Sequence, residues 1–341
     1  MKTSDFDYTL PQEYIAQVPI EPRDHSKLMV LDRAEGTIEH RRFFDLPHYL
    51  KEGDLLIFNE SRVIPARLIG HKAGSGGKVE ILLLHRKEAD LWETLVRPGQ
   101  RVREGTVIEI GSDPQITAEV IARGQGGTRT IRFSDEQEFN RLGIVPLPPY
   151  IHTPVADPER YQTVYSRISG SVAAPTAGLH FTPHLLTAIQ DKGIELAFVT
   201  LHVGMDSFRP VNTNDPLKHE MHSEYGEVSV EVADRINRAK DEGRRVICVG
   251  TTSVRLLETA AVMNKEDNKV SPYSGWTHMF ILPGYHFAVP DAVITNFHLP
   301  KSTLLMMICA FARTETILRA YKEAIENGYH FYSFGDAMLI V

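Results

Sequence analysis

The sequence predicts an α/β protein with a largely parallel sheet flanked by helices and an inserted small antiparallel β-barrel domain. From about residue 146 onward, apolar strand-like runs alternate with amphipathic helical segments, which is typical of parallel strands covered by helices. Between residues 67 and 134, short β-type runs follow one another with glycine or proline breaks and no helix, as in small barrels and sandwiches.

The barrel is expected to be an insertion in a discontinuous domain. The chain has 341 residues, enough for roughly two domains. We expect residues 1–66 and 146–341 to form the α/β domain and residues 67–145 to form the barrel, because the two ends of an inserted domain commonly lie close together. The expected barrel strands are 79–84, 91–96, 106–110, 116–121 and 128–133, with one short helix within 135–142.

Start and stop residues mark the elements of the α/β domain. A helix is expected to begin at Thr182-Pro183 and to end at Gly193. A second is expected to begin at Ser229 and to end at Gly243. The other expected elements are strands at 194–203, 246–249 and 331–341, a helix at 314–327 and a surface loop at 264–274.

The composition is that of an ordinary globular protein, with 42% hydrophobic and 24% charged residues. Cys248 and Cys309 are the only cysteines and lie in apolar runs, so we expect buried, inert thiols. The N-terminus lacks the apolar core of a signal peptide, and the longest apolar run, 304–312, is too short to span a bilayer. We therefore expect a cytoplasmic protein.

Charge is unevenly distributed along the chain. The net charge of −7 argues against a protein coated in nucleic acid. Residues 67–134, however, contain 11 Lys or Arg against 8 Asp or Glu. A basic module on an acidic body is compatible with docking one RNA, although charged strand edges give the same count for reasons of solubility alone.

The most informative segment is a strand–turn–helix junction near the C-terminus. A β-branched run ends just before Asn296 and His298. An apolar helical run then follows, with Ser302 or Thr303 as its expected N-cap. Helix starts bind carboxylates or phosphates, and open α/β sheets place ligands at the carboxyl ends of their strands. An ordinary capped βα turn is the alternative interpretation.

A second junction of this kind follows the strand at 246–249. After Gly250, which permits close backbone approach, come three hydroxyls and one cation: Thr251, Thr252, Ser253 and Arg255. A carboxylate or phosphate would be well held there. Helix capping together with an Arg255–Glu258 ion pair would explain the same residues.

The densest titratable cluster is residues 219–224, His-Glu-Met-His-Ser-Glu. As a strand it places Glu220, His222 and Glu224 on one face, where they would shift one another's pKa values, as acid–base catalysis needs. As a helix it lacks the zinc-protease spacing, because its histidines are three rather than four residues apart. A solvated charged edge fits the pattern as well.

Two further segments carry candidate ligands. Residues 169–182 are rich in small residues and nearly uncharged, so a flat ligand could lie against their backbone, or they could form a compact loop on the core. His202 stands at an expected strand end, where a lone histidine is usually structural.

Eight segments together form a pattern that no single motif provides. They are FDYTLP at 6–11, RVIPARL at 62–68, residues 169–182, LHVG at 201–204, MHSE at 221–224, VGTTSVR at 249–255, residues 295–305 and FGDAM at 334–338. The pattern resembles the S-adenosylmethionine:tRNA ribosyltransferase-isomerases of queuosine biosynthesis, over nearly the whole chain. The chain departs from the family at Asp206-Ser207, where Gly-Thr is usual, at Glu60-Ser61, where Asp-Thr is usual, and at Arg313, where Gly is usual.

The resemblance implies an activity. The ribosyl part of S-adenosylmethionine, the co-substrate, is transferred to 7-aminomethyl-7-deazaguanine at the tRNA wobble position and isomerised to give epoxyqueuosine, with release of adenine and methionine. The sulfonium acidifies the C5′ hydrogens, a base removes one, adenine leaves, the RNA amine adds, and epoxide closure expels methionine. The resemblance implies no metal and no membrane, and we expect a monomer.

Residues can be matched to these steps as hypotheses. The methionine carboxylate would be bound by Thr251, Thr252, Ser253 and Arg255. Adenine would be held by the loop 171–178, with Ser171, Thr176 and Gly178, and the ribose hydroxyls by Asn296. The C5′ base would be His222 or Glu224. The acid that protonates departing adenine would be His180, His202 or His298. The tRNA phosphates would be contacted by Arg97, Arg101, Arg103, Arg123, Arg129 and Arg132.

Two other functions fit parts of the sequence. A metal-dependent hydrolase could use the four titratable side chains at 219, 220, 222 and 224. A non-catalytic tRNA-binding protein would need only the basic barrel. A methyltransferase is disfavoured, because no early strand is followed by a Gly-x-Gly loop that opens a helix.

Overall fold

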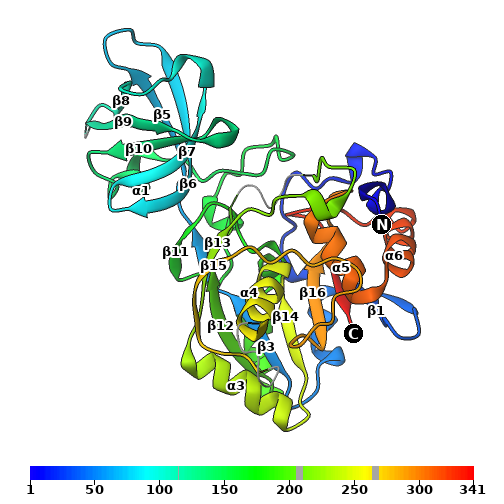
Figure 1. The fold of residues 1–341 in the computed structure, drawn as a ribbon. Coiled ribbons are helices and arrows are strands. Elements are labelled where there is room, and N and C mark those ends of the chain that lie inside the picture. The colour runs from blue at the N-terminus through cyan, green and yellow to red at the C-terminus, as the bar shows by residue number, and fades with distance from the viewer. Residues whose placement is uncertain (114, 205–209, 263–268) are drawn as a thin grey trace. The chain divides into compact units, whose positions relative to one another are not determined.

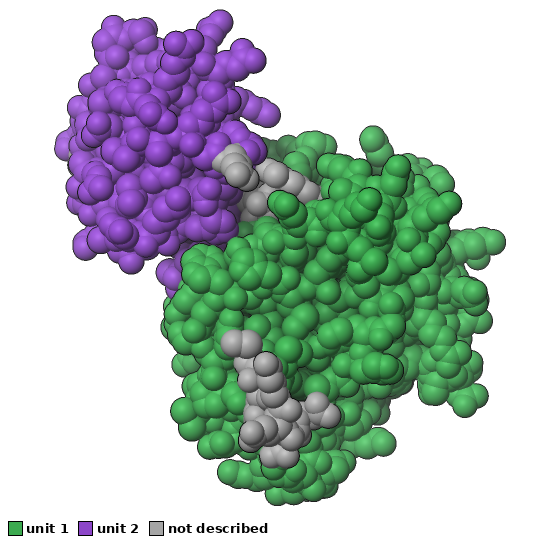
Figure 2. Space-filling model, viewed as in Figure 1, with its two compact units in different colours: residues 1–62, 148–168, 174–341 green, residues 63–147, 169–173 purple. Residues whose placement is uncertain are grey.

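The computed structural model describes residues 1–113, 115–204, 210–262 and 269–341. The described chain divides into two compact units, coloured separately in Figure 2. Unit 1 comprises Met1–Arg62, Pro148–Ile168 and Ala174–Val341, and unit 2 comprises Val63–Leu147 and Ser169–Ala173. The departure from the family pattern at Asp206-Ser207 lies outside the described residues.

Unit 1 is built on a nine-stranded mixed sheet (Figure 1). In spatial order the strands are β15 (Tyr273–Thr277), β13 (Glu224–Val228), β12 (Glu195–Leu201), β3 (Leu55–Asn59), β14 (Val246–Val249), β16 (Ala292–Asn296), β17 (Ala337–Ile340), β1 (Lys27–Leu31) and β2 (Ile38–Arg42). The strands from β12 to β16 are parallel, as are β1 and β17. The other neighbours are antiparallel. The predicted α/β sheet is confirmed, with a parallel centre and antiparallel additions on both sides.

Helices cover both faces of this sheet. They are α2 (Pro183–Asp191), α3 (Val230–Asp241), α4 (Thr251–Val262), α5 (Thr303–Ala312) and α6 (Thr314–Glu326), with short 3-10 helices at Thr3–Phe6, Gln12–Tyr14, Arg23–His25, Phe43–Tyr49, Pro158–Tyr161, Thr176–His180 and Pro216–Lys218. The side chains of Thr182, Ser229 and Ser302 accept hydrogen bonds from backbone N–H groups three residues later, which confirms these predicted helix starts. None of the helices in the described ranges combines the length and the hydropathy needed to cross a membrane.

The two faces of the central strands bury separate hydrophobic clusters. Leu55 of β3 packs with residues of α3, α4, α5 and α6, whereas Leu56 packs on the opposite face with residues of α2. Successive side chains of a strand point to opposite faces, so a strand covered on both faces is apolar nearly throughout. Cys248 and Cys309 lie in the first cluster as buried free thiols, as predicted.

Unit 2 contains a closed six-stranded barrel in which all neighbouring strands are antiparallel. Its elements are β5 (Arg67–Lys72), β6 (Lys78–Glu88), β7 (Leu91–Arg97), β8 (Val107–Gly111), β9 (Gln115–Arg123), β10 (Arg129–Phe133), α1 (Phe139–Leu142) and 3-10 turns at Gly99–Arg101 and Gln125–Gly127. Gly70 permits two strands to approach closely, because a Cβ there would clash with the carbonyl oxygen of Glu109. The predicted antiparallel barrel is confirmed. Outside it, β4 (Ser61–Val63) and β11 (Ile168–Ser171) pair as a separate two-stranded sheet.

Two predicted elements differ from the structure. Of the strand expected at 331–341, only Ala337–Ile340 is extended, because the Asp336 carboxylate accepts two backbone N–H groups and closes a turn before it. Of the loop expected at 264–274, residues 264–268 lie outside the described residues, and the last two residues begin β15.

Arg313, which joins α5 to α6, has a backbone conformation that suits glycine. Its φ is 63° and its ψ is 139°, and its side chain is exposed. Such a conformation costs a residue with a Cβ on the order of 1–3 kcal/mol. Arg313→Gly is therefore expected to raise the free energy of unfolding by about 1 kcal/mol in urea denaturation. Arg313→Ala removes the same charge but keeps the Cβ, so it should match the wild type; equal stability of the two variants would contradict backbone strain.

Candidate active site

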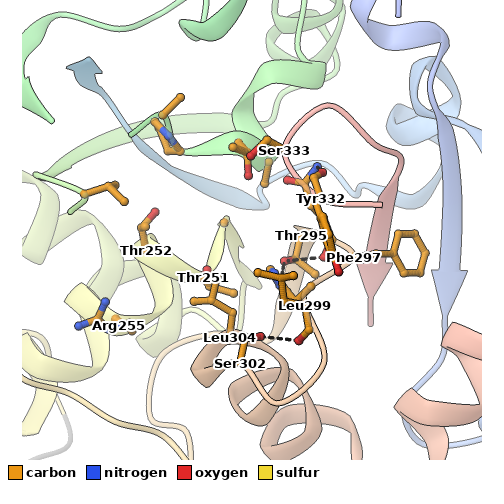
Figure 3. Close-up of a pocket in the computed structure, with 18 of the residues that line it drawn as sticks. Thr251, Thr252, Arg255, Thr295, Phe297, Leu299, Ser302, Leu304, Tyr332 and Ser333 are labelled. Atoms are coloured by element: carbon orange, nitrogen blue, oxygen red, sulfur yellow. Dashed lines mark hydrogen bonds between the residues drawn. The ribbon is translucent and has the colours of Figure 1, made fainter. Parts of the chain in front are cut away.

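A cavity in unit 1 opens where β14 and β16 end and where α4 and α5 begin (Figure 3). Its empty space, including open solvent at the mouth, is about 660 Å³. The polar residues that line it include Tyr150, Thr176, Thr251, Thr252, Arg255, Asn296, His298, Ser302 and Tyr332. Both strand–turn–helix junctions expected from the sequence meet here, at the carboxyl ends of neighbouring parallel strands.

A buried ion pair stands beside the cavity. Arg255, in the second turn of α4, donates through Nη1 to Glu224 at the start of β13, and through Nε to the carbonyl oxygen of Met279 at 3.2 Å. The exposed fractions of the two paired side chains are 1% and 0%. Burial alone would raise the pKa of Glu224, but the charge of Arg255 and a hydrogen bond from His222 lower it to about 2. Glu224 is thus an ionised partner that fixes the Arg255 guanidinium.

Glu258, one turn further along α4, is not the partner of Arg255 that the sequence spacing allowed. Its carboxylate accepts hydrogen bonds from the N–H groups of Ala288 at 3.0 Å and Val289 at 2.9 Å, and from the Tyr285 hydroxyl at 2.7 Å. Glu258 therefore anchors the segment that leads into β16.

Three buried polar atoms of the cavity lining have no hydrogen-bond partner among the described residues. They are Thr252 Oγ1, Arg255 Nη2 and Asn296 Oδ1. Unpaired buried polar atoms are rare in native proteins, because each costs about 1–3 kcal/mol. The cavity lining thus has two donors without a partner, one of them cationic, and one acceptor without a partner among the described residues. This set indicates a polar ligand that carries an anionic group and hydrogen-bond donors.

The three histidines predicted as acids are held neutral. Burial lowers the pKa of both His180 and His298 to about 3, and it also lowers the pKa of His202. His298 lines the cavity, with its Nε2 at 2.7 Å from Thr295 Oγ1. His180 contacts the side chain of Asn296, and His202 follows the end of β12.

Of the conformations considered for the segment 219–224, the strand that would place its carboxylates and His222 on one face is not formed. The strand β13 begins only at Glu224, and Glu220 is exposed whereas Glu224 is buried, so the two do not share a face. His222 Nε2 lies 3.5 Å from Glu224 Oε1. Over the described ranges of the chain, no group of three or more His, Cys, Asp or Glu side chains is placed to hold a metal ion.

Three residues predicted as ligands make other contacts. The Ser253 hydroxyl donates a hydrogen bond to the carbonyl oxygen of Val249 at 2.9 Å, a contact that serines in the first turn of a helix often make. Gly178 packs so closely that a Cβ would overlap the Tyr165 hydroxyl. Ser171 ends β11 and belongs to unit 2. The cavity itself therefore retains Thr176, Thr251, Thr252, Arg255, Asn296 and His298 from the predicted set.

The aromatic side of the cavity was not predicted from the sequence. The rings of Tyr150 and Tyr332 lie 4.8 Å apart, and the Tyr150 hydroxyl is 2.7 Å from Ser333 Oγ. Tyr332 has a φ of 71° in the turn before β17. The only sequence signal was the FGDAM motif, which begins immediately after Ser333.

Comparison with known proteins places the chain in a family. A family model described as "Queuosine biosynthesis protein" matches residues 3–340. Two proteins called S-adenosylmethionine:tRNA ribosyltransferase-isomerase, from Dehalococcoides mccartyi strain CBDB1 and Clostridioides difficile strain 630, are 55% and 54% identical over 100% of both chains. The chain belongs to the S-adenosylmethionine:tRNA ribosyltransferase-isomerase family. A crystal structure of an S-adenosylmethionine tRNA ribosyltransferase from Thermotoga maritima, 40% identical, covers 99% of this chain and 100% of its own, with a TM-score of 0.58.

The resemblance of this chain to the S-adenosylmethionine:tRNA ribosyltransferase-isomerase family is thereby confirmed, and one departure from its pattern is explained by the structure. Glu60, where Asp is usual, is largely buried and accepts a hydrogen bond from Arg167 Nε at 2.6 Å. Ser61 is fully buried. The side chain of Glu60, which is longer than that of Asp, thus pairs with the Arg167 guanidinium.

Proposed function

We propose that the cavity of unit 1 binds S-adenosylmethionine as the ribosyl donor. The activity is that of the family: ribosyl transfer and isomerisation from S-adenosylmethionine, forming epoxyqueuosine. The methionine carboxylate would bind Arg255 Nη2, the Thr252 hydroxyl and the free N–H groups at the start of α4. The observation that carries this assignment is the set of three buried, unpaired polar atoms in the cavity lining.

His222 is the better candidate for the C5′ base. Glu224 is a weak base, because its pKa is about 2 and Arg255 holds one of its oxygens. The His222 side chain is 12% exposed and lies 3.5 Å from the other oxygen of Glu224. A carboxylate beside a catalytic histidine orients the ring and stabilises the imidazolium that forms. Glu224 would thus serve both His222 and Arg255.

Adenine would lie against Thr176 and near His298. Of the three histidines considered as acids, His298 is the one that lines the cavity, and its low pKa keeps it neutral. It would therefore offer a hydrogen bond to departing adenine rather than a full positive charge. Asn296 would accept a hydrogen bond from the ribose hydroxyls.

The amine acceptor would be tRNA carrying 7-aminomethyl-7-deazaguanine at its wobble position. The proposed steps need no metal ion, because the sulfonium itself acidifies the C5′ hydrogens and methionine leaves as a neutral thioether. We expect the chain to work as a monomer.

An assay of adenine release tests the proposed function. Incubation with S-adenosylmethionine and precursor tRNA is expected to yield free adenine and epoxyqueuosine in equal amounts, and neither when one substrate is omitted. Retention of tRNA without adenine release would favour a non-catalytic tRNA-binding protein. Adenine release that stops on metal chelation would favour the metal-dependent hydrolase.

Charge reversal of arginines on the barrel tests where tRNA binds. Arg129 is a poor candidate, because it is buried and its guanidinium donates to backbone carbonyl oxygens, including those of Val102 and Gly99. The other five predicted arginines are exposed. Reversal of Arg101, Arg103 and Arg123 to Glu is expected to weaken tRNA binding and to flatten the slope of log affinity against log salt by about 2–3.

A matched control separates a local contact from the change in net charge. Lys51, Arg238 and Lys322 are exposed cations of unit 1, and their reversal changes the net charge by the same amount. This second triple variant is expected to keep a salt slope close to that of the wild type. Unchanged affinity and slope in the barrel variant would place the RNA elsewhere.

A further inference from the structure

The amide of Asn296 is fixed in one orientation by its surroundings. Its Nδ2 lies 3.1 Å from the carbonyl oxygen of Tyr332 and 3.1 Å from His180 Nε2. A carbonyl oxygen can only accept a hydrogen bond, so the NH2 end of the amide must face Tyr332. The other end, Oδ1, then belongs to the cavity lining, where it is buried and has no partner among the described residues.

The same geometry dictates the tautomer of His180. Because Asn296 Nδ2 is a donor, His180 Nε2 must accept, and the ring proton must reside on Nδ1. Nδ1 lies 2.8 Å from the Ser26 hydroxyl, whose oxygen can accept a hydrogen bond from Nδ1–H. Burial lowers the pKa of His180 to about 3, so the ring is neutral at physiological pH and able to accept.

Packing restricts this chain of hydrogen bonds further. Ser26 and His180 are 1% and 4% exposed. The His180 ring stacks on Phe43, with centroids 4.9 Å apart and planes at 28°. The three linked residues come from three distant segments, before β1, at the end of the 3-10 helix Thr176–His180, and at the end of β16. A ring held in this way can rotate little, so it fixes the orientation of the Asn296 amide.

We propose that Ser26 and His180 are positioning residues, which hold Asn296 Oδ1 as a fixed hydrogen-bond acceptor for a hydroxyl or amino group of the ribosyl donor. The inference rests on the proposed binding of S-adenosylmethionine in this cavity. It reassigns His180 from acid to positioning residue. It also gives a role to Ser26, which no sequence motif indicated.

Ser26→Ala and Ser26→Thr test the inference in the full-length enzyme. Loss of the hydroxyl removes the group that accepts a hydrogen bond from Nδ1–H of His180. The ring is then free to take the other tautomer, in which Nε2–H would face the NH2 group of Asn296 and no hydrogen bond could form between them. Ser26→Ala is expected to weaken S-adenosylmethionine binding about tenfold, as for one lost hydrogen bond, in calorimetry. Ser26→Thr keeps a hydroxyl and is expected to restore most of the affinity. Wild-type affinity in Ser26→Ala, or an equal loss in both variants, would overturn the proposal.

The tautomer itself provides a readout that a packing role would not move. In ¹⁵N NMR of the wild-type enzyme, His180 is expected to show a protonated Nδ1 and an unprotonated Nε2 at pH 7, and Ser26→Ala is expected to shift this balance. A protonated Nε2 in the wild type would overturn the proposal, even if Ser26→Ala failed to fold. If the wild type did not bind S-adenosylmethionine at all, the proposed function would fail, and the NMR result would still report on the hydrogen-bond chain.

Discussion

Replacement of His222 by alanine is expected to slow adenine release in a single turnover by about 10²–10⁴-fold, the usual contribution of a general base. The ring is half-buried and 3.5 Å from Glu224 Oε1, so its imidazolium would form beside a carboxylate. Glu224 cannot readily substitute, because its pKa is about 2 and Arg255 holds its other oxygen. Rapid-quench measurement with enzyme in excess over precursor tRNA isolates this step from product release.

His219 supplies the matched control for this substitution. It lies three residues earlier and is likewise half-buried, with its ring packed edge-to-face on Phe280. His219→Ala is expected to release adenine at close to the wild-type rate. A near-normal rate in His222→Ala would remove His222 from the role of base.

Glu224→Ala is expected to lower the free energy of unfolding by about 3–5 kcal/mol, since it leaves a buried, unpaired guanidinium. The same change frees Arg255 Nη1, so the guanidinium loses the orientation in which Nη2 is open at the cavity. S-adenosylmethionine binding should therefore weaken along with stability. Urea denaturation and calorimetry measure the two effects separately.

Glu220→Ala is the control, because Glu220 is an exposed carboxylate in the same segment. It should change stability by no more than about 0.5 kcal/mol. Equal stabilities of the Glu224 and Glu220 variants would contradict the buried ion pair.

The ion pair also predicts an acid dependence of stability. The pKa of Glu224 falls from its ordinary value of 4.5 to about 2 in the folded chain. A lowered folded-state pKa contributes stability that is complete above the unfolded pKa and is lost as the pH falls toward the folded one. Between pH 4.5 and 2, Glu224→Gln should therefore lose less stability than the wild type, since it lacks this titration.

Individual helices and strands could be predicted because the residues that start or end them lie within or next to each element. Ser229 and Ser302 bear cap hydroxyls at the positions where helices begin, and the barrel strands are separated by glycines that the turns require. The antiparallel strands β13 and β15 could not be placed, because strand pairing depends on partners distant in sequence. The late start of β17 could not be predicted either, because it depends on hydrogen bonds that Asp336 accepts from the backbone of Lys27 and His330 in the folded chain.

The candidate site was predictable in position but less so in detail. Two strand–turn–helix junctions indicated the carboxyl ends of parallel strands, and the cavity lies there. The Arg255–Glu224 pair was not predicted, and Glu258 was considered only as an alternative partner, because local spacing cannot reveal which carboxylate a distant strand brings near Arg255. Likewise, nothing in the sequence shows that His180 is buried behind Asn296, since burial is a property of the fold.

A crystal structure with S-adenosylmethionine bound is the most direct test of the proposed site. We predict the methionine carboxylate within hydrogen-bonding distance of Arg255 Nη2 and Thr252 Oγ1, with a donor of the ligand on Asn296 Oδ1. Density for the ligand inside the barrel of unit 2, or a carboxylate bound away from the start of α4, would contradict the proposed site.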